Sequence, residues 1–159
     1  MIKENESGFS LIELLIVVAI LGIIMAIAVP NLLASRRAAN EGSAVSSMRT
    51  IHSCQMTFRA TTGVGEYGDL PTLALDTLTD VVLGSGSKSG YNFVVTPTVP
   101  GTLPAQYYGT AVPIITVGVG RTGTRRFGVS EDGVIHGDSV ALTPYADESA
   151  VRAAQALGN

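Results

Sequence analysis

Residues 8–30 read GFSLIELLIVVAILGIIMAIAVP, and this stretch decides the fold. From Leu11 to Val29 it is apolar except for Gly22 and one carboxylate, Glu13. A helix rises about 1.5 Å per residue, so a helix over this stretch covers the ~30 Å hydrocarbon core of a bilayer. Aliphatic side chains surround it, which argues against a half-exposed surface helix. The stretch predicts a helix that can cross a membrane, in which a buried carboxylate needs a reason.

The rest of the chain limits the possible functions. Its 159 residues suffice for one domain with an appended segment. The formal net charge is −3, and no basic run is longer than Arg36-Arg37 or Arg125-Arg126. This pattern does not indicate nucleic-acid binding. The single cysteine, Cys54, cannot form an internal disulfide.

The residues leave three interpretations of the apolar stretch open. A secretory signal peptide would use Ala26-Ile27-Ala28 as its small-x-small cleavage pattern, but the leader MIKENESG has one Lys against two Glu, where such leaders are positive. A plain single-pass anchor fits the length but gives Glu13 no role. The third interpretation starts from the junction between Gly8 and Phe9, where a short polar leader ending in glycine meets the apolar helix.

The sequence G/FSLIE around this junction closely resembles the processing site of the type IV pilin and pseudopilin family. The resemblance extends over residues 9–55, FSLIELLIVVAILGIIMAIAVPNLLASRRAANEGSAVSSMRTIHSCQ. It implies that a prepilin peptidase cuts between Gly8 and Phe9 and N-methylates the new amino terminus of Phe9. The apolar helix is then retained, and it anchors the subunit in the inner membrane until the subunit joins a helical filament.

Two roles are considered for Glu13. Cleavage frees the amino group of Phe9, and a buried charge left alone is far worse than a buried pair. We therefore hypothesise, in line with the family, that Glu13 of an incoming subunit pairs with the Phe9 amino group of a neighbour and sets the axial register. The alternative is a local contact with the amino end of its own helix, where the dipole favours negative charge.

Gly22 and Pro30 predict a weak point in the helix. Pro30 lacks an N–H group and glycine is a poor helix former, so the stretch between them can kink or melt. The family resemblance implies that this segment is partly unwound in filaments. A gentle static kink remains the alternative.

Charge counting opposes the family in one respect. Arg36-Arg37 follows the apolar stretch, whereas the leader has one Lys and two Glu. The positive-inside rule would therefore place the C-terminal part in the cytoplasm, whereas the family implies the opposite side.

The remaining sequence predicts an α+β fold, with the ladle shape that the resemblance implies. Ala44, Met48, Ile51, Gln55 and Phe58 share one helix face, so a single helix from Phe9 to about Ala60 has a second half that packs on a sheet. The apolar half is expected to protrude. We divide the chain into a leader at 1–8, a transmembrane and filament-core helix at 9–30, an amphipathic second half at 31–62, and a head at 63–159.

The head is expected to hold three or four antiparallel strands. Strand patterns occur at 91–96, 105–112, 125–130 and 133–137, and Asp132-Gly133 between the last two is a strong hairpin signal. The stretch PIITVGVG at 113–120 fits either a further strand or an extended loop. Short helices are expected from about Leu73 to Leu83, and in the tail after the start signal Thr143-Pro144.

Several motifs resemble ligand-binding or metal-binding sequences but do not predict such sites. GVGRTG at 118–123 fits a dinucleotide fingerprint, but a strand pattern follows it where a helix is required. GSGSKS at 84–89 lacks the glycine of a phosphate loop. His52 and Cys54 face different directions on a helix, so they cannot share a metal. The polar residues around the hairpin are interpreted as a solvated turn: Glu131, Asp132, His136 and Asp138. We expect no enzyme activity, no cofactor and no metal site.

The sequence therefore indicates a structural subunit of a type IV pilus. The alternative within the family is a type II secretion pseudopilin, which forms a short periplasmic filament. The alternative from another class is a membrane-anchored binding protein that never polymerises. The resemblance implies these partners: copies of the chain, the prepilin peptidase, an inner-membrane platform protein, assembly and retraction ATPases, and a secretin if the cell has an outer membrane. It implies an inner-membrane precursor and an extracellular filament.

Overall fold

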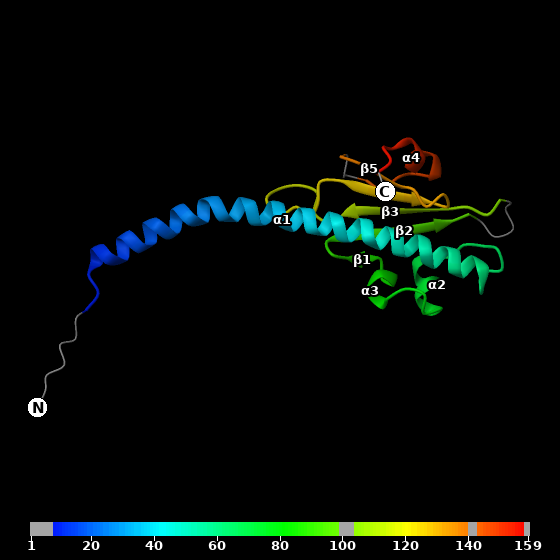
Figure 1. Ribbon diagram of the computed structural model, residues 1–159, viewed down its shortest axis with the longest axis horizontal. Helices are drawn as coiled ribbons and strands as arrows, with labels where there is room; N and C mark the ends of the chain where they lie inside the picture. The colour runs from blue at the N-terminus through cyan, green and yellow to red at the C-terminus, as the bar shows by residue number, and fades with distance from the viewer. Residues whose placement is uncertain (1–7, 99–103, 140–142, 158–159) are drawn as a thin grey trace, which may run out of the picture. The chain divides into compact units, whose positions relative to one another are not determined.

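The computed structural model describes residues 8–98, 104–139 and 143–157, which fall into two compact units divided between Ser35 and Arg36. Figure 1 shows the elements in chain order: α1 (Leu11–Ala60), α2 (Leu70–Leu75), α3 (Val81–Gly84), β1 (Ser87–Lys88), β2 (Tyr91–Pro97), β3 (Tyr107–Pro113), β4 (Arg126–Ser130), β5 (Ile135–Asp138) and α4 (Glu148–Ala153). This is the α+β architecture that the sequence predicts, with a long first helix followed by an antiparallel sheet.

The second half of α1 packs its predicted face into the core. The five residues of that face are all buried: Ala44, Met48, Ile51, Gln55 and Phe58. Three of them join aromatic residues of the sheet, including Tyr91, Phe93 and Phe127, in one hydrophobic cluster. The prediction of this face from its spacing is confirmed.

The sheet has five antiparallel strands in the order β1-β2-β3-β4-β5. This is one strand more than the highest number expected, because Ser87 and Lys88 form a two-residue strand in a stretch without strand character. The predicted hairpin joins β4 to β5, and Gly133 in its turn has a φ of +73°. Positive φ is easily reached by glycine, which explains the Asp-Gly signal.

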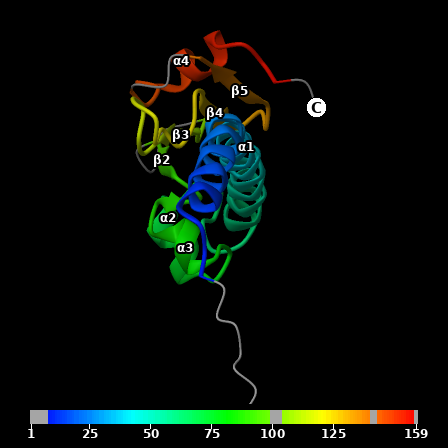
Figure 2. The same ribbon diagram turned by 90° about the vertical axis from the view of Figure 1, so that its left-hand side faces the viewer.

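Helices cover both faces of the sheet (Figure 2). A Cβ added at Gly109 of β3 would lie 3.4 Å from Met48 of α1. On the opposite face, a Cβ at Gly128 of β4 would lie 2.9 Å from Val151 of α4 and 3.0 Å from Tyr145. Gly128 therefore leaves the space in which α4 docks.

The prediction of one helix from Leu73 to Leu83 is wrong, because two shorter helices, α2 and α3, occupy this region. Asp76 ends α2, and Asp80 begins α3 by accepting a hydrogen bond from the backbone N–H of Leu83. Aspartate competes for backbone groups and favours helix ends over helix interiors. The stretch at 113–120 is a loop after Pro113, the last residue of β3.

The terminal helix exists but begins later than its predicted start signal. Asp147, rather than Thr143-Pro144, caps α4 by accepting a hydrogen bond from the backbone N–H of Ala150 at 2.8 Å. After α4 the chain returns along β5, where the backbone N–H of Leu157 donates to the carbonyl of Ile135 at 2.7 Å. This return covers part of the β5 edge, which would otherwise offer unpaired backbone groups.

Candidate functional site

The junction between Gly8 and Phe9 is accessible in the folded chain. Phe9 is 86% exposed, and a Cβ added at Gly8 would meet no atom within 4 Å. No contact with the described residues therefore requires a glycine at position 8 or an aromatic residue at position 9. Both residue types call for an explanation outside the packing of the single chain.

Glu13 contacts the start of its own helix. Its Oε2 accepts a hydrogen bond from the backbone N–H of Ser10 at 2.9 Å. Ser10 precedes α1, so the pair forms one half of an S-x-x-E capping box. This is the local contact named as the alternative role of Glu13. One carboxylate offers about four acceptor positions, so the contact leaves capacity for a cation.

Around Glu13 the first half of α1 is an unbroken exposed apolar surface. Every residue from Leu11 to Leu32 is exposed. Nine large aliphatic side chains precede Gly22 in this stretch: Leu11, Ile12, Leu14, Leu15, Ile16, Val17, Val18, Ile20 and Leu21. Soluble monomers rarely expose apolar patches above a few hundred Å². The helix is long and apolar enough to cross a membrane. This surface therefore requires lipid or other protein chains around it.

Gly22 and Pro30 both lie inside α1, which remains α-helical at both positions. A Cβ at Gly22 would meet no atom within 4 Å, so the single chain gives no packing reason for that glycine. Their predicted role in kinking or melting the helix stays a prediction.

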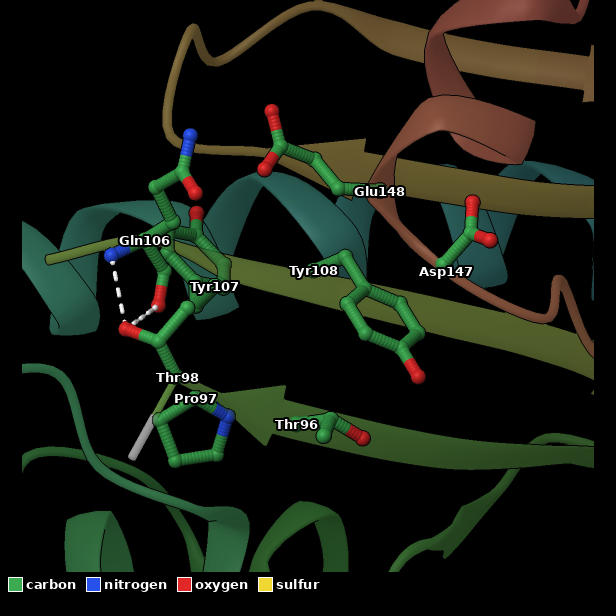
Figure 3. A pocket seen from close by; sticks show the side chains of 8 residues that line it. All are labelled: Thr96, Pro97, Thr98, Gln106, Tyr107, Tyr108, Asp147 and Glu148. Atoms are coloured by element: carbon green, nitrogen blue, oxygen red, sulfur yellow. Dashed lines mark hydrogen bonds between the residues drawn. The ribbon is translucent and has the colours of Figure 1, made fainter. Parts of the chain in front are cut away.

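The head also has a cavity of about 430 Å³ at the ends of β2 and β3 (Figure 3). It is lined by Thr96, Pro97, Thr98, Gln106, Tyr107, Tyr108, Asp147 and Glu148. The polar groups here serve the fold: the Thr98 hydroxyl bonds the backbone of Gln106, and the Tyr108 hydroxyl donates to the Ala146 carbonyl at 3.0 Å. Asp147 caps α4. The lining therefore presents no catalytic arrangement among the residues shown.

The other residues that looked chemical also have structural partners. His52 Nδ1 lies 2.8 Å from the Tyr107 hydroxyl, whereas the thiol of Cys54 donates to the carbonyl of Leu78. Burial raises the pKa of the Cys54 thiol. GVGRTG is followed by β4, as the sequence indicates, so no helix receives a phosphate there.

The carboxylates near the hairpin are joined by an arginine. Arg152 of α4 lies 2.5 Å from Glu131 and 2.7 Å from Glu148, and its Nε is 4.0 Å from Asp132. Within the described ranges, no group of three or more His, Cys, Asp or Glu side chains could hold a metal ion. The guanidinium of Arg152 therefore supplies the positive charge that a bound metal ion would supply to these carboxylates.

Comparison with known proteins identifies the amino-terminal segment. The prokaryotic N-terminal methylation motif matches residues 3–29. Over 38 residues the chain is 60% identical to the type IV wide pilus major component PilA4 of Thermus thermophilus, a match covering 24% of this chain and 29% of that protein. The amino-terminal segment of the chain is thus similar to that of a type IV pilin. The matched motif spans the junction between Gly8 and Phe9 as well as Glu13 and Gly22.

Two further relatives are a type IV major pilin and a type II secretion protein. The major pilin protein PilA of Myxococcus xanthus is 41% identical over 56 residues, which are 35% of this chain and 26% of the relative. The type II secretion system core protein G of Aeromonas hydrophila is 42% identical over 46 residues, which are 29% and 32% of the two chains. Each match spans less than a third of the relative's own length. No solved structure matches the chain significantly.

Ser10 and Arg152 were missed as site residues at the sequence level. The signal for Ser10 is present in the sequence, because Ser10-Leu11-Ile12-Glu13 fits the capping-box pattern. Arg152 carried no such signal, since it reaches Glu131 only after α4 has folded back over the sheet.

Proposed function

We propose that this chain is the structural subunit of a type IV pilus. It is made as a precursor, cut between Gly8 and Phe9, N-methylated at Phe9, and polymerised through its apolar helix. The observation that carries the proposal is a lone carboxylate, Glu13, in the exposed aliphatic first half of α1, which matches the N-terminal methylation motif. A surface of this kind is stable only in lipid or against other copies of the same helix.

The proposed assembly step pairs charges between subunits. After cleavage the amino group of Phe9 is a cation, and residues 9–12 no longer carry a polar leader. In a filament core that excludes water, an unpaired Glu13 would be strongly unfavourable, whereas a pair with the Phe9 amino group of a neighbour satisfies both charges. Any other register leaves both charges in hydrocarbon, so the pair selects register even where it adds no net stability.

Glu13→Gln separates the local role of Glu13 from the intersubunit role. Glutamine keeps an oxygen that accepts the Ser10 N–H bond, but it carries no charge. Leaving a buried charge unpaired costs about 3–5 kcal/mol, which weakens subunit association roughly a hundredfold or more. We expect cleavage to continue and fibre yield, measured by shearing and immunoblotting, to fall to background. Normal yield from Glu13→Gln would mean that the local cap is the only role of this residue.

The mass of the mature amino terminus tests processing independently. Peptide mass spectrometry should find an N-methylated Phe9 as the first residue. An intact leader, or a cut after Ala28, would contradict processing by a prepilin peptidase. Gly8→Leu should leave the chain uncut, because a bulky residue replaces the glycine at the proposed cleavage site, where an added Cβ meets no atom within 4 Å.

The second candidate function is a type II secretion pseudopilin, which the similarity to core protein G specifically favours. Electron microscopy of sheared cells distinguishes the two, because a pilin gives long extracellular fibres and a pseudopilin gives a filament confined to the envelope. A processed chain that forms neither would instead be the third option, an anchored binding protein.

The proposed partners and locations follow from this function. Before assembly the subunit sits in the inner membrane, where it meets the prepilin peptidase and a platform protein. Cytoplasmic ATPases drive its assembly and retraction indirectly, and a secretin passes the fibre through an outer membrane if there is one. We propose a structural role without enzyme activity, in line with the relatives, which are pilus and secretion components.

A further inference from the structure

The loop between β3 and β4 exposes a second apolar surface, on the head. Within residues 114–119, here called the apolar loop, four branched aliphatic side chains are exposed to solvent: Ile114, Ile115, Val117 and Val119. Val117 is 71% exposed and Val119 is 78% exposed. Burying such side chains is favourable, so a run of four on one short loop is a candidate contact surface.

Hydrogen bonds hold this loop in place. The backbone N–H of Thr122 donates to the Ile115 carbonyl at 2.9 Å, which closes the loop on itself. Asn40 of α1 donates from its side-chain amide to the Thr122 carbonyl at 2.9 Å. Glu41 accepts two bonds from Thr124, from the backbone N–H at 2.7 Å and from the hydroxyl at 2.6 Å. The loop is therefore fastened to α1 at positions 40 and 41.

That fastening point lies close to the apolar segment along the chain. Asn40 follows Leu33, the last large aliphatic residue of the segment, by seven positions within α1. The loop is therefore bonded to the chain only a few residues after the apolar segment ends.

The charges near the loop favour an anionic surface. Residues 81–130 contain four basic residues and no aspartate or glutamate. Lys88 and Arg126 form ion pairs with Asp80 and Asp138. The remaining two are Arg121, which follows the loop directly, and Arg125. The Glu41 carboxylate is engaged by Thr124. A second exposed apolar group, on α2 and α3, instead lies beside Asp76 and beside Asp80, which is paired with Lys88. Anionic lipids would therefore attract the first surface more strongly than the second.

We propose that the apolar loop enters the headgroup region of an anionic phospholipid bilayer while the subunit is anchored there. The inference rests on the membrane anchor of the proposed function and not on polymerisation. Ile114, Ile115, Val117 and Val119 contact acyl chains at the interface, and Arg121 contacts lipid phosphates. The head is thereby held at the membrane surface before assembly, and extraction into a filament has to break this contact.

A single tryptophan can report the contact, because the natural chain contains none. The full chain with Val117→Trp is reconstituted in vesicles of phosphatidylethanolamine and phosphatidylglycerol. The matched control is Leu75→Trp. Leu75 is 83% exposed and precedes Asp76, whose carboxylate accepts a hydrogen bond from Thr62. Emission wavelength and quenching by brominated lipids are measured, together with flotation of the chain with the vesicles.

We expect the tryptophan at 117 to emit at shorter wavelength and to lose most of its emission with brominated lipids. The control at 75 should do neither, and Arg121→Glu should reduce the quenching at 117. If the tryptophan at position 117 is protected from aqueous quenchers but is not quenched by brominated lipids, the loop contacts a second copy of the chain. That result would overturn the proposal. Equal quenching at both positions, or none at 117 in a chain that floats, would overturn it as well.

A chain that fails to float contradicts the membrane anchor and the loop contact together. A chain that floats but whose tryptophan at position 117 is not quenched by brominated lipids contradicts the loop contact alone. Fibre formation is unaffected by either fluorescence result, so the proposed pilus function is tested separately.

Discussion

At the scale of single residues, Gln55 is the one polar side chain on the predicted core face of α1, and its hydrogen bonds explain why it is there. Its side chain is fully buried at 0% exposure, and both ends of its amide bond the backbone of Gly68. The Nε2 group donates to the Gly68 carbonyl at 2.5 Å, and Oε1 accepts from the Gly68 N–H at 3.1 Å. Gln55 thus ties the segment before α2 to the helix.

Gln55→Leu should destabilise the head although leucine suits a core. The substitution leaves the Gly68 N–H and carbonyl buried without partners, at about 1–3 kcal/mol for each group. Urea unfolding in detergent should show a lower midpoint. Gln155→Leu at an exposed position is the control and should match the natural chain. If both variants unfold at the same midpoint, the clamp is not a stabilising feature.

Gly123 shows a close approach that the sequence does not reveal. A Cβ at this position would lie 2.0 Å from the hydroxyl of Tyr91, which donates to the Arg125 carbonyl at 2.9 Å. Gly123→Ala should therefore cost about 1–3 kcal/mol, as overpacking of a core does. Gly120→Ala in the same loop meets no atom within 4 Å and is the control. If Gly123→Ala and Gly120→Ala unfold at the same temperature, this packing is contradicted.

At the scale of elements, all three short helices begin in the same way. Each follows an aspartate that accepts a hydrogen bond from the backbone N–H three positions on: Asp69 from Thr72, Asp80 from Leu83 and Asp147 from Ala150. The pKa of each aspartate lies below its ordinary 3.8 because of hydrogen bonds, chiefly from Thr72 to Asp69, Lys88 to Asp80 and Ser149 to Asp147. The carboxylate form is thus the one that caps.

Acid should therefore loosen the starts of these helices. Since each folded pKa is lowered, the stabilisation is present above pH 3.8 and is lost as pH falls through the folded value. Hydrogen-exchange protection of the Thr72, Leu83 and Ala150 amides should decline in that window. The Gly137 amide bonds the Gln155 carbonyl and is the control. Uniform loss of protection at all four amides would indicate global unfolding instead of loss of the caps.

Periodicity predicts elements that pack, and local side-chain chemistry decides where they end. The α1 face and the Asp132-Gly133 hairpin follow from spacing and turn chemistry alone, and both are confirmed. The helix expected at 73–83 is wrong because Asp80 caps a new helix inside an apolar run. The docking of α4 depends on the missing side chain of Gly128, which only the folded sheet places beneath Val151.

At the scale of the whole molecule, buried tyrosines make the head sensitive to alkali. Burial raises the pKa of Tyr145 to about 12, and burial also raises the pKa values of Tyr91 and Tyr107. Above pH 10 these groups ionise in the unfolded chain while they stay protonated in the folded one. Each raised pKa therefore contributes stability that is complete below pH 10 and is lost as pH rises through the folded value.

The urea midpoint should accordingly fall as pH rises above about 10. Tyr145→Phe removes one of these groups and gives up only a 3.3 Å bond to Asp138, so it should lose less stability in alkali than the natural chain. Phenolate absorbance should rise together with unfolding. Ionisation of all tyrosines before unfolding would contradict the burial.

The candidate site could be proposed from the sequence alone because it lies in one continuous stretch. Gly8, Phe9 and Glu13 share a short motif, and their proposed partners belong to other molecules, so folding of the single chain adds little to them. The apolar loop was not predictable in this way, since 113–120 fits strand or loop equally. Its place beside Asn40 appears only when residues 82 positions apart are brought together.

Cys54 has a practical consequence for imaging. Its thiol is buried, bonded to the Leu78 carbonyl, and harder to ionise than a free thiol, so maleimide dyes will attack it slowly. Leu75→Cys would place a fast-reacting thiol on the surface without removing the natural one. Living cells could then be stained at that position, and the growth and withdrawal of any fibre followed by light microscopy.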